Sequence, residues 1–349
     1  MAVEIIAPNK PKKKKSHLLD FFIIFIVLCL IGGGVYAFIY AFQDYSQMRH
    51  MELTWTEVVD IANTDDPDKP TTYLEYQVKP VENNNINDNT GNRPNSIILP
   101  GIIVPSVKEE MTVVDIAEDN TAQVDYLYRP INLNALRKVN EDVSGYIYIP
   151  NTKVDYPIMK ETVPEAYYYL SHNINREVDR YGSIFEISDS ERKISEMNNA
   201  VNIIFGHNMR SGAMFAGITN YKYQGYSSNP VYIYRDNYRI EYMPFAFCTV
   251  DCHDSLYDFD AFELGSENYK NLLDWIMSKN SINFKTEAPN ENEPIIVLST
   301  CRDADSDVRQ IVCLREIRKA IVPEYYDSLQ EVYQYGGDTN GIVNTNSES

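Results

Sequence analysis

Positive charge, cysteine and histidine are all scarce in this sequence of 349 residues, and the first two shortages exclude whole classes of protein. The chain has 31 Lys and Arg residues against 50 Asp and Glu residues, which gives a formal net charge of −19. A nucleic-acid binder needs a basic face that displaces counterions, so no nucleic-acid partner is expected. Five cysteines are too few for a disulfide scaffold. The hydrophobic content of 44% is in turn too high for an intrinsically disordered protein.

The first apolar feature is the uncharged stretch of residues 21–42, which follows a lysine-rich segment, residues 1–20. A stretch of this length crosses roughly 30 Å of hydrocarbon as a helix. A cleaved secretory signal is the alternative, but the apolar part is long for one and no clear cleavage site follows. Because lysines stay on the cytoplasmic side, residues 1–20 are expected in the cytoplasm. We therefore expect a transmembrane signal anchor in the lipid bilayer of the cell membrane, a single pass, with an extracellular C-terminal part.

Residues 43–130 are polar and irregular, and seven of the thirteen residues from 83 to 95 are Asn. Such a composition is typical of a flexible loop, so we interpret residues 43–130 as an extracellular linker or accessory region. Val58-Val59-Asp60-Ile61-Ala62 recurs as Val113-Val114-Asp115-Ile116-Ala117. This repeat is either a short duplication or a coincidence between two β-prone segments.

The sequence pattern changes in residues 131–322, which contain short runs rich in Tyr, Ile and Val between turn residues. Such runs predict β-strands, and an apolar stripe around Trp275 predicts one helix between the sixth and seventh of them. Closely spaced strands with few long helices predict a mainly β domain, a barrel or a sandwich. Residues 323–349 are a polar C-terminal tail. The predicted strands are 145–149, 154–159, 182–187, 202–206, 231–234, 239–250, 294–300 and 309–317.

Cys301 ends the seventh predicted strand and is followed by a charged loop. A buried cysteine is ordinarily an inert small hydrophobe, but a strand end beside a polar loop brings the thiol next to solvent. Arg309 opens the eighth strand, and the loop is short enough to return it beside Cys301. A guanidinium there can lower the pKa of a thiol and stabilise an oxyanion. The alternative for Arg309 is a surface salt bridge to the aspartates of the loop.

The chain has five histidines, and His207 is the one that ends an apolar strand. It is therefore the best partner for Cys301 among them. His253 follows Cys248 and Cys252, an arrangement that suggests a metal ligand set. This Cys-x3-Cys-His cluster lacks a second ligand pair, so we expect no metal site.

Several motifs occur together in one order along the chain. Gly206-His207-Asn208-Met209 is followed by Gly212-Ala213-Met214-Phe215, by the strand end Leu298-Ser299-Thr300-Cys301, and by Arg309. Upstream of them lie Gly145-Tyr146-Ile147-Tyr148-Ile149-Pro150, Val154-Asp155-Tyr156-Pro157, Tyr169-Leu170 and Gly182-Ser183-Ile184-Phe185. Over about residues 131–320 the sequence resembles a class B sortase.

The resemblance implies a membrane-anchored cysteine transpeptidase of Gram-positive bacteria on an eight-stranded sortase-type β-barrel with short peripheral helices and no cofactor. Cys301 would be the nucleophile that attacks the carbonyl of a Thr in the C-terminal sorting signal of a surface protein. His207 would protonate the departing amine, and Arg309 would hold the substrate backbone and the developing oxyanion. An amine of a peptidoglycan precursor would then resolve the thioacyl-enzyme, which anchors the protein to the cell wall. Substrate-binding residues would be Leu170, Ser299 and Thr300.

Three alternatives are open. A cysteine protease would use water in place of the amine, although His before Cys excludes the papain order. A pilin-polymerising sortase often has an Asp-Pro-aromatic lid, and Asp66-Pro67 is followed by Asp68 instead. A non-enzymatic surface adhesin would not need Cys, His and Arg at three strand ends.

The position of the apolar run 97–107 has two interpretations within a sortase. It either docks as a lid near the groove that binds the sorting signal or packs on the far side of the barrel.

Overall fold

The computed structural model describes residues 17–78, 96–99, 102–105, 108–116, 125–161, 167–187, 200–257, 262–301 and 307–328. The chain divides into two compact units, residues 1–56 and 57–349. Helix α1 (His17–Ala62) contains the expected anchor, residues 21–42, but the side chains of residues 21–28, 30 and 31 lie outside the described part. Among the described residues, no helix combines the length and the apolar character that a membrane crossing requires.

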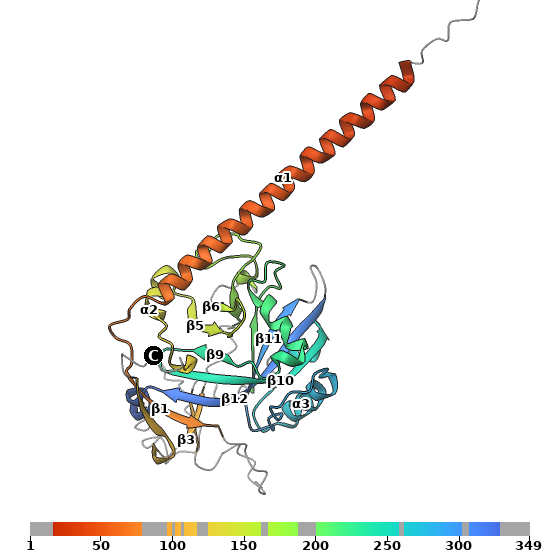
Figure 1. Cartoon of the computed structure of the whole chain (residues 1–349). Helices are drawn as coiled ribbons and strands as arrows, with labels where there is room; N and C mark the ends of the chain where they lie inside the picture. The colour runs from red at the N-terminus through yellow and green to blue at the C-terminus, as the bar shows by residue number, and fades with distance from the viewer. Residues whose placement is uncertain are drawn as a thin grey trace, which may run out of the picture. The chain divides into compact units, whose positions relative to one another are not determined.

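The second unit is mainly β, as the sequence predicts (Figure 1). All eight predicted strands are present within a few residues of their expected bounds, and the predicted helix is α3. The helices and 3₁₀ turns of the second unit are α2 (Leu133–Val139), α3 (Glu267–Lys279), η1 (Lys108–Glu110), η2 (Tyr126–Tyr128), η3 (Tyr168–Leu170), η4 (Phe215–Lys222), η5 (Gln224–Tyr226) and η6 (Ser255–Tyr257). Its strands are β1 (Thr72–Gln77), β2 (Ser96–Leu99), β3 (Ile102–Pro105), β4 (Thr112–Asp115), β5 (Val143–Tyr148), β6 (Asp155–Lys160), β7 (Ile184–Glu186), β8 (Val201–Phe205), β9 (Val231–Tyr234), β10 (Tyr238–Asp251), β11 (Ile295–Cys301) and β12 (Val308–Ile321).

Eight of these strands, β5 to β12, close into a barrel. Their order is β10-β9-β5-β6-β7-β8-β11-β12, and β12 pairs back with β10 from Val308 to Ile321. The pairs β6–β7 and β8–β11 are parallel, and the other pairs in the ring are antiparallel. A closed ring leaves none of its own strands with an unpaired edge. The closure therefore decides between the barrel and the sandwich in favour of the barrel.

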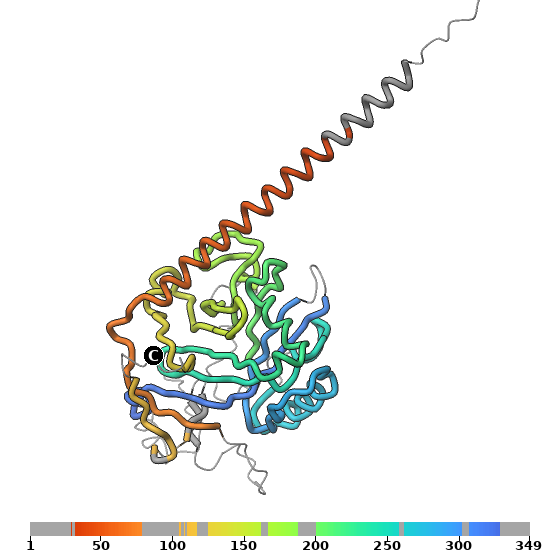
Figure 2. Tube along the Cα trace, in the orientation of Figure 1, coloured from red at the N-terminus to blue at the C-terminus, as the bar shows by residue number. Residues whose placement is uncertain are grey.

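Strand β12 is longer than predicted, and its extra length holds part of the region interpreted as a linker. Beyond the pairing with β11, residues 318–321 pair with β1, and β4 pairs with the other edge of β1. Figure 2 shows this N-terminal segment in orange beside the blue C-terminal strand. The two copies of the short repeat differ in structure, because Val58–Ala62 is helical in α1 whereas Val113–Asp115 is in β4, which favours coincidence over duplication.

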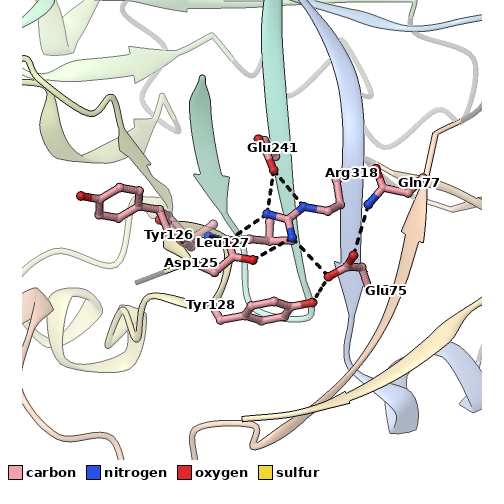
Figure 3. A network of polar contacts seen from close by, with 9 residues as sticks. Glu75, Gln77, Asp125, Tyr126, Leu127, Tyr128, Glu241 and Arg318 are labelled. Atoms are coloured by element: carbon pink, nitrogen blue, oxygen red, sulfur yellow. Dashed lines mark hydrogen bonds and ion pairs between the residues drawn. The ribbon is translucent and has the colours of Figure 1, made fainter. Parts of the chain in front are cut away.

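A polar network around Arg318 fixes this added segment to the barrel (Figure 3). The guanidinium of Arg318 contacts Glu241 on β10 at 2.8 Å, Asp125 at 2.7 Å and Glu75 on β1 at 3.4 Å. The hydroxyl of Tyr128 also donates a hydrogen bond to Glu75. Burial alone would lower the pKa of Arg318, but its bonds to these carboxylates raise that pKa above its ordinary value. The cation is therefore held between three acidic side chains.

The apolar run 97–107 is described at residues 97–99 and 102–105, where β2 and β3 form an antiparallel pair. The hydroxyl of Tyr326 donates a hydrogen bond to the carbonyl of Pro105 at 3.0 Å. Tyr326 follows the C-terminal end of β12, whereas Arg309 lies near its start, on the order of 40 Å away along an extended strand. This contact supports packing away from the expected groove and does not support the lid.

One apolar core lies between α3 and the sheet formed by β8, β11, β12 and β10. Tyr269, Leu272 and Ile276 of α3 pack there with strand residues such as Val297 and Ile311, all nearly inaccessible to water. Ser266 caps the N-terminus of helix α3, and its hydroxyl accepts a hydrogen bond from the backbone N–H of Tyr269 at 3.1 Å. Each large apolar side chain buried here contributes about 1.5–3 kcal/mol. The core thus supports the strands that end in the predicted site.

Candidate active site

The predicted catalytic residues lie at the ends of three neighbouring strands. Cys301 is the last residue of β11, and its cross-strand partner on β12 is Arg309. On the other side of β11, the parallel register with β8 ends at the pair Ser299 and Phe205. His207 follows Phe205 by two residues, as Cys301 follows Ser299, so an extension of this register past the end of β8 would place His207 level with Cys301. Because adjacent strands are about 4.8 Å apart, the order His207, Cys301, Arg309 places the cysteine between a base and a cation.

At Cys301, strand β11 passes from the buried interior to the surface of the barrel. Every residue from Ile295 to Thr300 is buried, whereas Cys301 is partly exposed. Its backbone is fixed by Asn208, whose side-chain amide donates a hydrogen bond to the carbonyl of Cys301 at 3.1 Å. The thiol therefore lies at a rigid strand end with access to solvent, as a nucleophile requires.

His207 follows β8 directly and is held in a defined orientation. Its Nε2 lies 2.7 Å from the backbone carbonyl oxygen of Leu170, and a carbonyl can only accept a hydrogen bond. This contact therefore requires the proton on Nε2. Gly206 precedes the histidine, and a Cβ there would come within 2.4 Å of Ile184 and 2.8 Å of Phe215. A glycine lets the chain pass this packed position before it presents the imidazole.

The segment that carries Leu170 is itself fixed at two points. Glu161 accepts backbone N–H groups from Tyr167 at 2.9 Å and from Tyr169 at 3.3 Å, and burial raises the pKa of its carboxyl. Gly182 has a φ of +53°, and a Cβ there would come within 2.5 Å of the Leu170 carbonyl. Leu170, a predicted substrate-binding residue, is 40% exposed. Its backbone carbonyl accepts the hydrogen bond from His207.

Ser299 and Thr300, the other two predicted substrate-binding residues, are both buried. The hydroxyl of Thr300 donates to the carbonyl of Gly206 at 2.6 Å, which joins β11 to the chain before His207. The hydroxyl of Ser299 lies 2.9 Å from that of Tyr257. Both side chains make bonds within the protein that stabilise the strand ends, and their contact with substrate stays a prediction.

Tyr257 is a residue of this site that the sequence did not indicate. It belongs to η6, between β10 and α3, and its ring stacks against Phe205 on β8 at 6.3 Å between centroids. Burial raises the pKa of Tyr257 to about 12, against the Ser299 hydrogen bond and the charge of Arg309, which lower it. Asn208 was also missed as a site residue, although it stands in the Gly-His-Asn-Met motif.

The chain's thiols differ in how strongly burial suppresses ionisation. Burial raises the pKa of Cys248 to about 12 and that of Cys313 well above its ordinary value. Both lie in the core against α3, and the thiol of Cys248 donates to the carbonyl of Ile276 at 3.4 Å. These two thiols are held in the unreactive, protonated form.

Cys248, Cys252 and His253 do not lie together, because Cys248 is buried in that core. Instead, donor atoms of Asp251, Cys252 and His253 lie within 4.8 Å of one another at the end of β10. The pKa of Asp251 is lowered, first by the backbone N–H and side chain of His253 and to a smaller degree by Arg309. Burial raises the pKa of Cys252, which the charge of Arg309 opposes. This cluster therefore lies in the field of the predicted catalytic arginine.

Comparison with known proteins finds two curated relatives by sequence. The chain is 30% identical over 181 residues to Sortase B of Listeria monocytogenes, covering 50% of this chain and 68% of that protein. It is 27% identical over 190 residues to Sortase B of Staphylococcus aureus, covering 53% and 74%. Sortase B of Clostridium perfringens is a similar solved structure, with a TM-score of 0.47, 27% identity, and coverage of 53% of this chain and 98% of that one. No family model matches the sequence.

Proposed function

Since the chain belongs to the class B sortase family and is a sortase-type cysteine transpeptidase, we propose that Cys301, His207 and Arg309 carry out its reaction. The observation that supports this most strongly is the order of the three strand ends. The partly exposed Cys301 ends β11, Arg309 is its cross-strand partner on β12, and His207 follows the neighbouring strand β8. The substrate that we propose is a C-terminal sorting signal of a surface protein, cleaved after a Thr.

In the proposed reaction, the thiolate of Cys301 attacks the carbonyl carbon of the Thr, and the carbonyl oxygen becomes an oxyanion. Arg309, directly across from Cys301, stabilises this negative charge. The carbon–nitrogen bond then breaks, and the departing amine takes a proton from His207. An acceptor amine, for which we propose a peptidoglycan precursor, gives a proton to His207 and attacks the thioester. The products are a new amide, the regenerated thiolate of Cys301 and a reprotonated His207.

Leu170 has two parts in this proposal. Its exposed side chain lines the substrate groove, and its carbonyl holds the Nε2 proton of His207 in the resting state. When the leaving amine takes up position, it replaces this carbonyl as the partner of Nε2–H. The imidazole is thus oriented before the substrate arrives, which reduces the reorganisation needed in the transition state.

We further propose that residues 21–42 anchor the chain in the cell membrane, with the barrel on the extracellular side. Support comes from the sequence, in which a lysine-rich segment precedes a long uncharged apolar stretch. Expression of the full chain and of residues 43–349 in a Gram-positive host separates the outcomes. We expect the full chain to stay in the membrane fraction and residues 43–349 to be released. Equal release of the two proteins would contradict the proposed anchor.

The proposed activity is tested with the full chain, a library of Thr-containing sorting-signal peptides and an amine acceptor that mimics a peptidoglycan cross-bridge. Mass spectrometry of the products is expected to show the peptide cut after Thr and joined to the amine. Cleavage that adds water at every acceptor concentration would indicate a protease instead. Cys29→Ser, which removes a thiol remote in sequence from the barrel, is the matched control for substitutions of Cys301.

A further inference from the structure

The end of β10 carries a cluster of metal-binding side chains that the proposed reaction does not use. The cluster consists of Asp251, Cys252 and His253, whose metal-binding atoms all lie within 4.8 Å of one another. No other group of three such side chains meets this limit within the described residues. The carboxylate of Asp251 lies 2.8 Å from Nδ1 of His253, and the thiol of Cys252 lies 3.3 Å from the same nitrogen. A thiol, an imidazole and a carboxylate are the three ligand types that zinc takes in proteins.

A fourth donor comes from the neighbouring strand segment. Asp307 precedes β12, and its Oδ1 lies 3.9 Å from the sulfur of Cys252. With metal–ligand bonds of about 2.0–2.3 Å, the donors of a tetrahedral zinc site are about 3.3–3.8 Å apart. The observed separations of 2.8, 3.3 and 3.9 Å bracket this range. An ion would take the place of the Nδ1 proton that His253 donates to Asp251. Asp307 lies near Cys252 but outside the group whose donor atoms are all within 4.8 Å of one another, so its side chain would rotate to complete the set.

The backbone of this turn is already fixed. The N–H of Cys252 donates to the carbonyl of Asp307 at 2.8 Å, and the N–H of Asp251 donates to Asp254 at 2.9 Å. The side chains that would move are solvent-accessible, at 79% for His253 and 53% for Asp251. An incoming ion can therefore reach the donors directly, without opening the core and with little reorganisation of the backbone.

From this arrangement we propose that Asp251, Cys252 and His253, with Asp307 as the fourth donor, bind a thiophilic divalent cation such as Zn²⁺. The ion binds the Cys252 thiolate, and the proton of the thiol is released to solvent. The cluster also lies one residue along β10 from the cross-strand partner of Arg309, because Val250 and Asp251 on β10 pair with Arg309 and Val308 on β12. A doubly charged ion there repels the guanidinium of Arg309, whose charge acts on both Asp251 and Cys252. Occupancy is therefore inhibitory, and this second part rests on the proposed function.

Binding is tested with Co²⁺ as a spectroscopic substitute for Zn²⁺, in the full chain carrying Cys301→Ala so that the catalytic thiol cannot bind the metal. We expect one Co²⁺ per chain with a thiolate-to-cobalt charge-transfer absorption that added Zn²⁺ removes. Cys252→Ser should abolish this absorption, and His253→Ala should weaken binding, while the matched thiol control Cys29→Ser changes neither. Absence of the absorption, or its persistence in Cys252→Ser, would overturn the site.

Inhibition is tested separately in chains that keep Cys301. Zn²⁺ should lower kcat/KM for peptide by about fivefold or more, the lower end of typical coupling between two sites, and the Cys252→Ser chain should resist it. Equal inhibition of both chains would assign the effect to zinc on Cys301 and His207 and overturn the inhibitory part. If the chain shows no transpeptidation without metal, the proposed function fails, while the Co²⁺ spectrum still decides the binding site.

Discussion

At the scale of single residues, the cysteines of the barrel are separated by their positions in the sheet. Cys248 and Cys313 lie in the core against α3, where burial keeps their thiols protonated, whereas Cys301 ends its strand in partial contact with solvent. The sequence placed Cys301 at a strand end because six apolar and small residues precede it and a charged loop follows. The sequence could not show that the hydroxyls of Ser299 and Thr300 turn inward to Tyr257 and Gly206.

His207→Ala should lower kcat/KM for a sorting-signal peptide by about a hundredfold or more, because the leaving amine then departs without its proton donor. Steady-state kinetics with an amine acceptor measure the effect. His172→Ala is the matched control, since His172 lies in the same unit and makes its contacts with Tyr168. Equal losses in the two variants would show that the histidine acts through local structure and not as an acid and base.

Arg309→Lys should lose about a hundredfold in kcat/KM, close to the loss expected for Arg309→Ala. An ammonium places one point charge where the planar guanidinium offers a fork of donors to an oxyanion. The melting temperature of both variants shows whether the fold is intact. Near-normal kcat/KM in the lysine variant would mean that Arg309 supplies a diffuse positive charge and no directed hydrogen bonds.

At the scale of elements, the register of β8, β11 and β12 creates the site, and the second half of β12 binds the N-terminal segment. The positions and order of the barrel strands were readable because each lies between turn residues, whereas the full lengths of β7 and β12 were not. The pairing of β1 with residues 318–321 was not readable, because residues distant in sequence pair there through backbone groups that leave no local pattern. The same reason hid Asp307 as a neighbour of Cys252.

Arg318→Met should lower the free energy of unfolding by about 2–4 kcal/mol, because the partly buried carboxylates of Glu75 and Glu241 and the exposed carboxylate of Asp125 lose their shared cation. Denaturant unfolding of the full chain, read from a barrel tyrosine signal, measures the change. Lys69→Met is the comparison, since it breaks an exposed pair with Asp65 and should cost about 1 kcal/mol or less. Equal effects would mean that the network in Figure 3 contributes no more than a surface ion pair.

At the scale of the whole molecule, the barrel contains charge as well as apolar side chains. Glu186 on β7 is buried and pairs with Arg235 at 2.8 Å, and it also accepts a hydrogen bond from Ser144 at 2.6 Å. Burial alone would raise the pKa of Glu186, but Arg235 and these bonds lower it below 4.5. A carboxyl with a lowered pKa stabilises the native state when it is ionised, and that contribution disappears on protonation.

The free energy of unfolding should therefore be insensitive to Glu186 above about pH 4.5 and fall as the pH drops further through the lowered pKa. Urea unfolding between pH 3 and 7, at intervals on the order of half a unit, measures the slope. The double variant Glu186→Gln/Arg235→Met should show a shallower acid slope than the natural chain. An unchanged slope would assign the acid sensitivity to other carboxyls.

The central claim is that Cys301 forms the thioacyl intermediate, and mass spectrometry of the trapped adduct tests it most directly. The full chain is mixed with sorting-signal peptide in the absence of amine, quenched in acid and digested. The account predicts an acyl group that ends in Thr on the peptide containing Cys301. It predicts no adduct in Cys301→Ala, with adduct retained in Cys252→Ala and Cys313→Ala. An adduct that persists in Cys301→Ala, or that maps to another cysteine, would contradict the account.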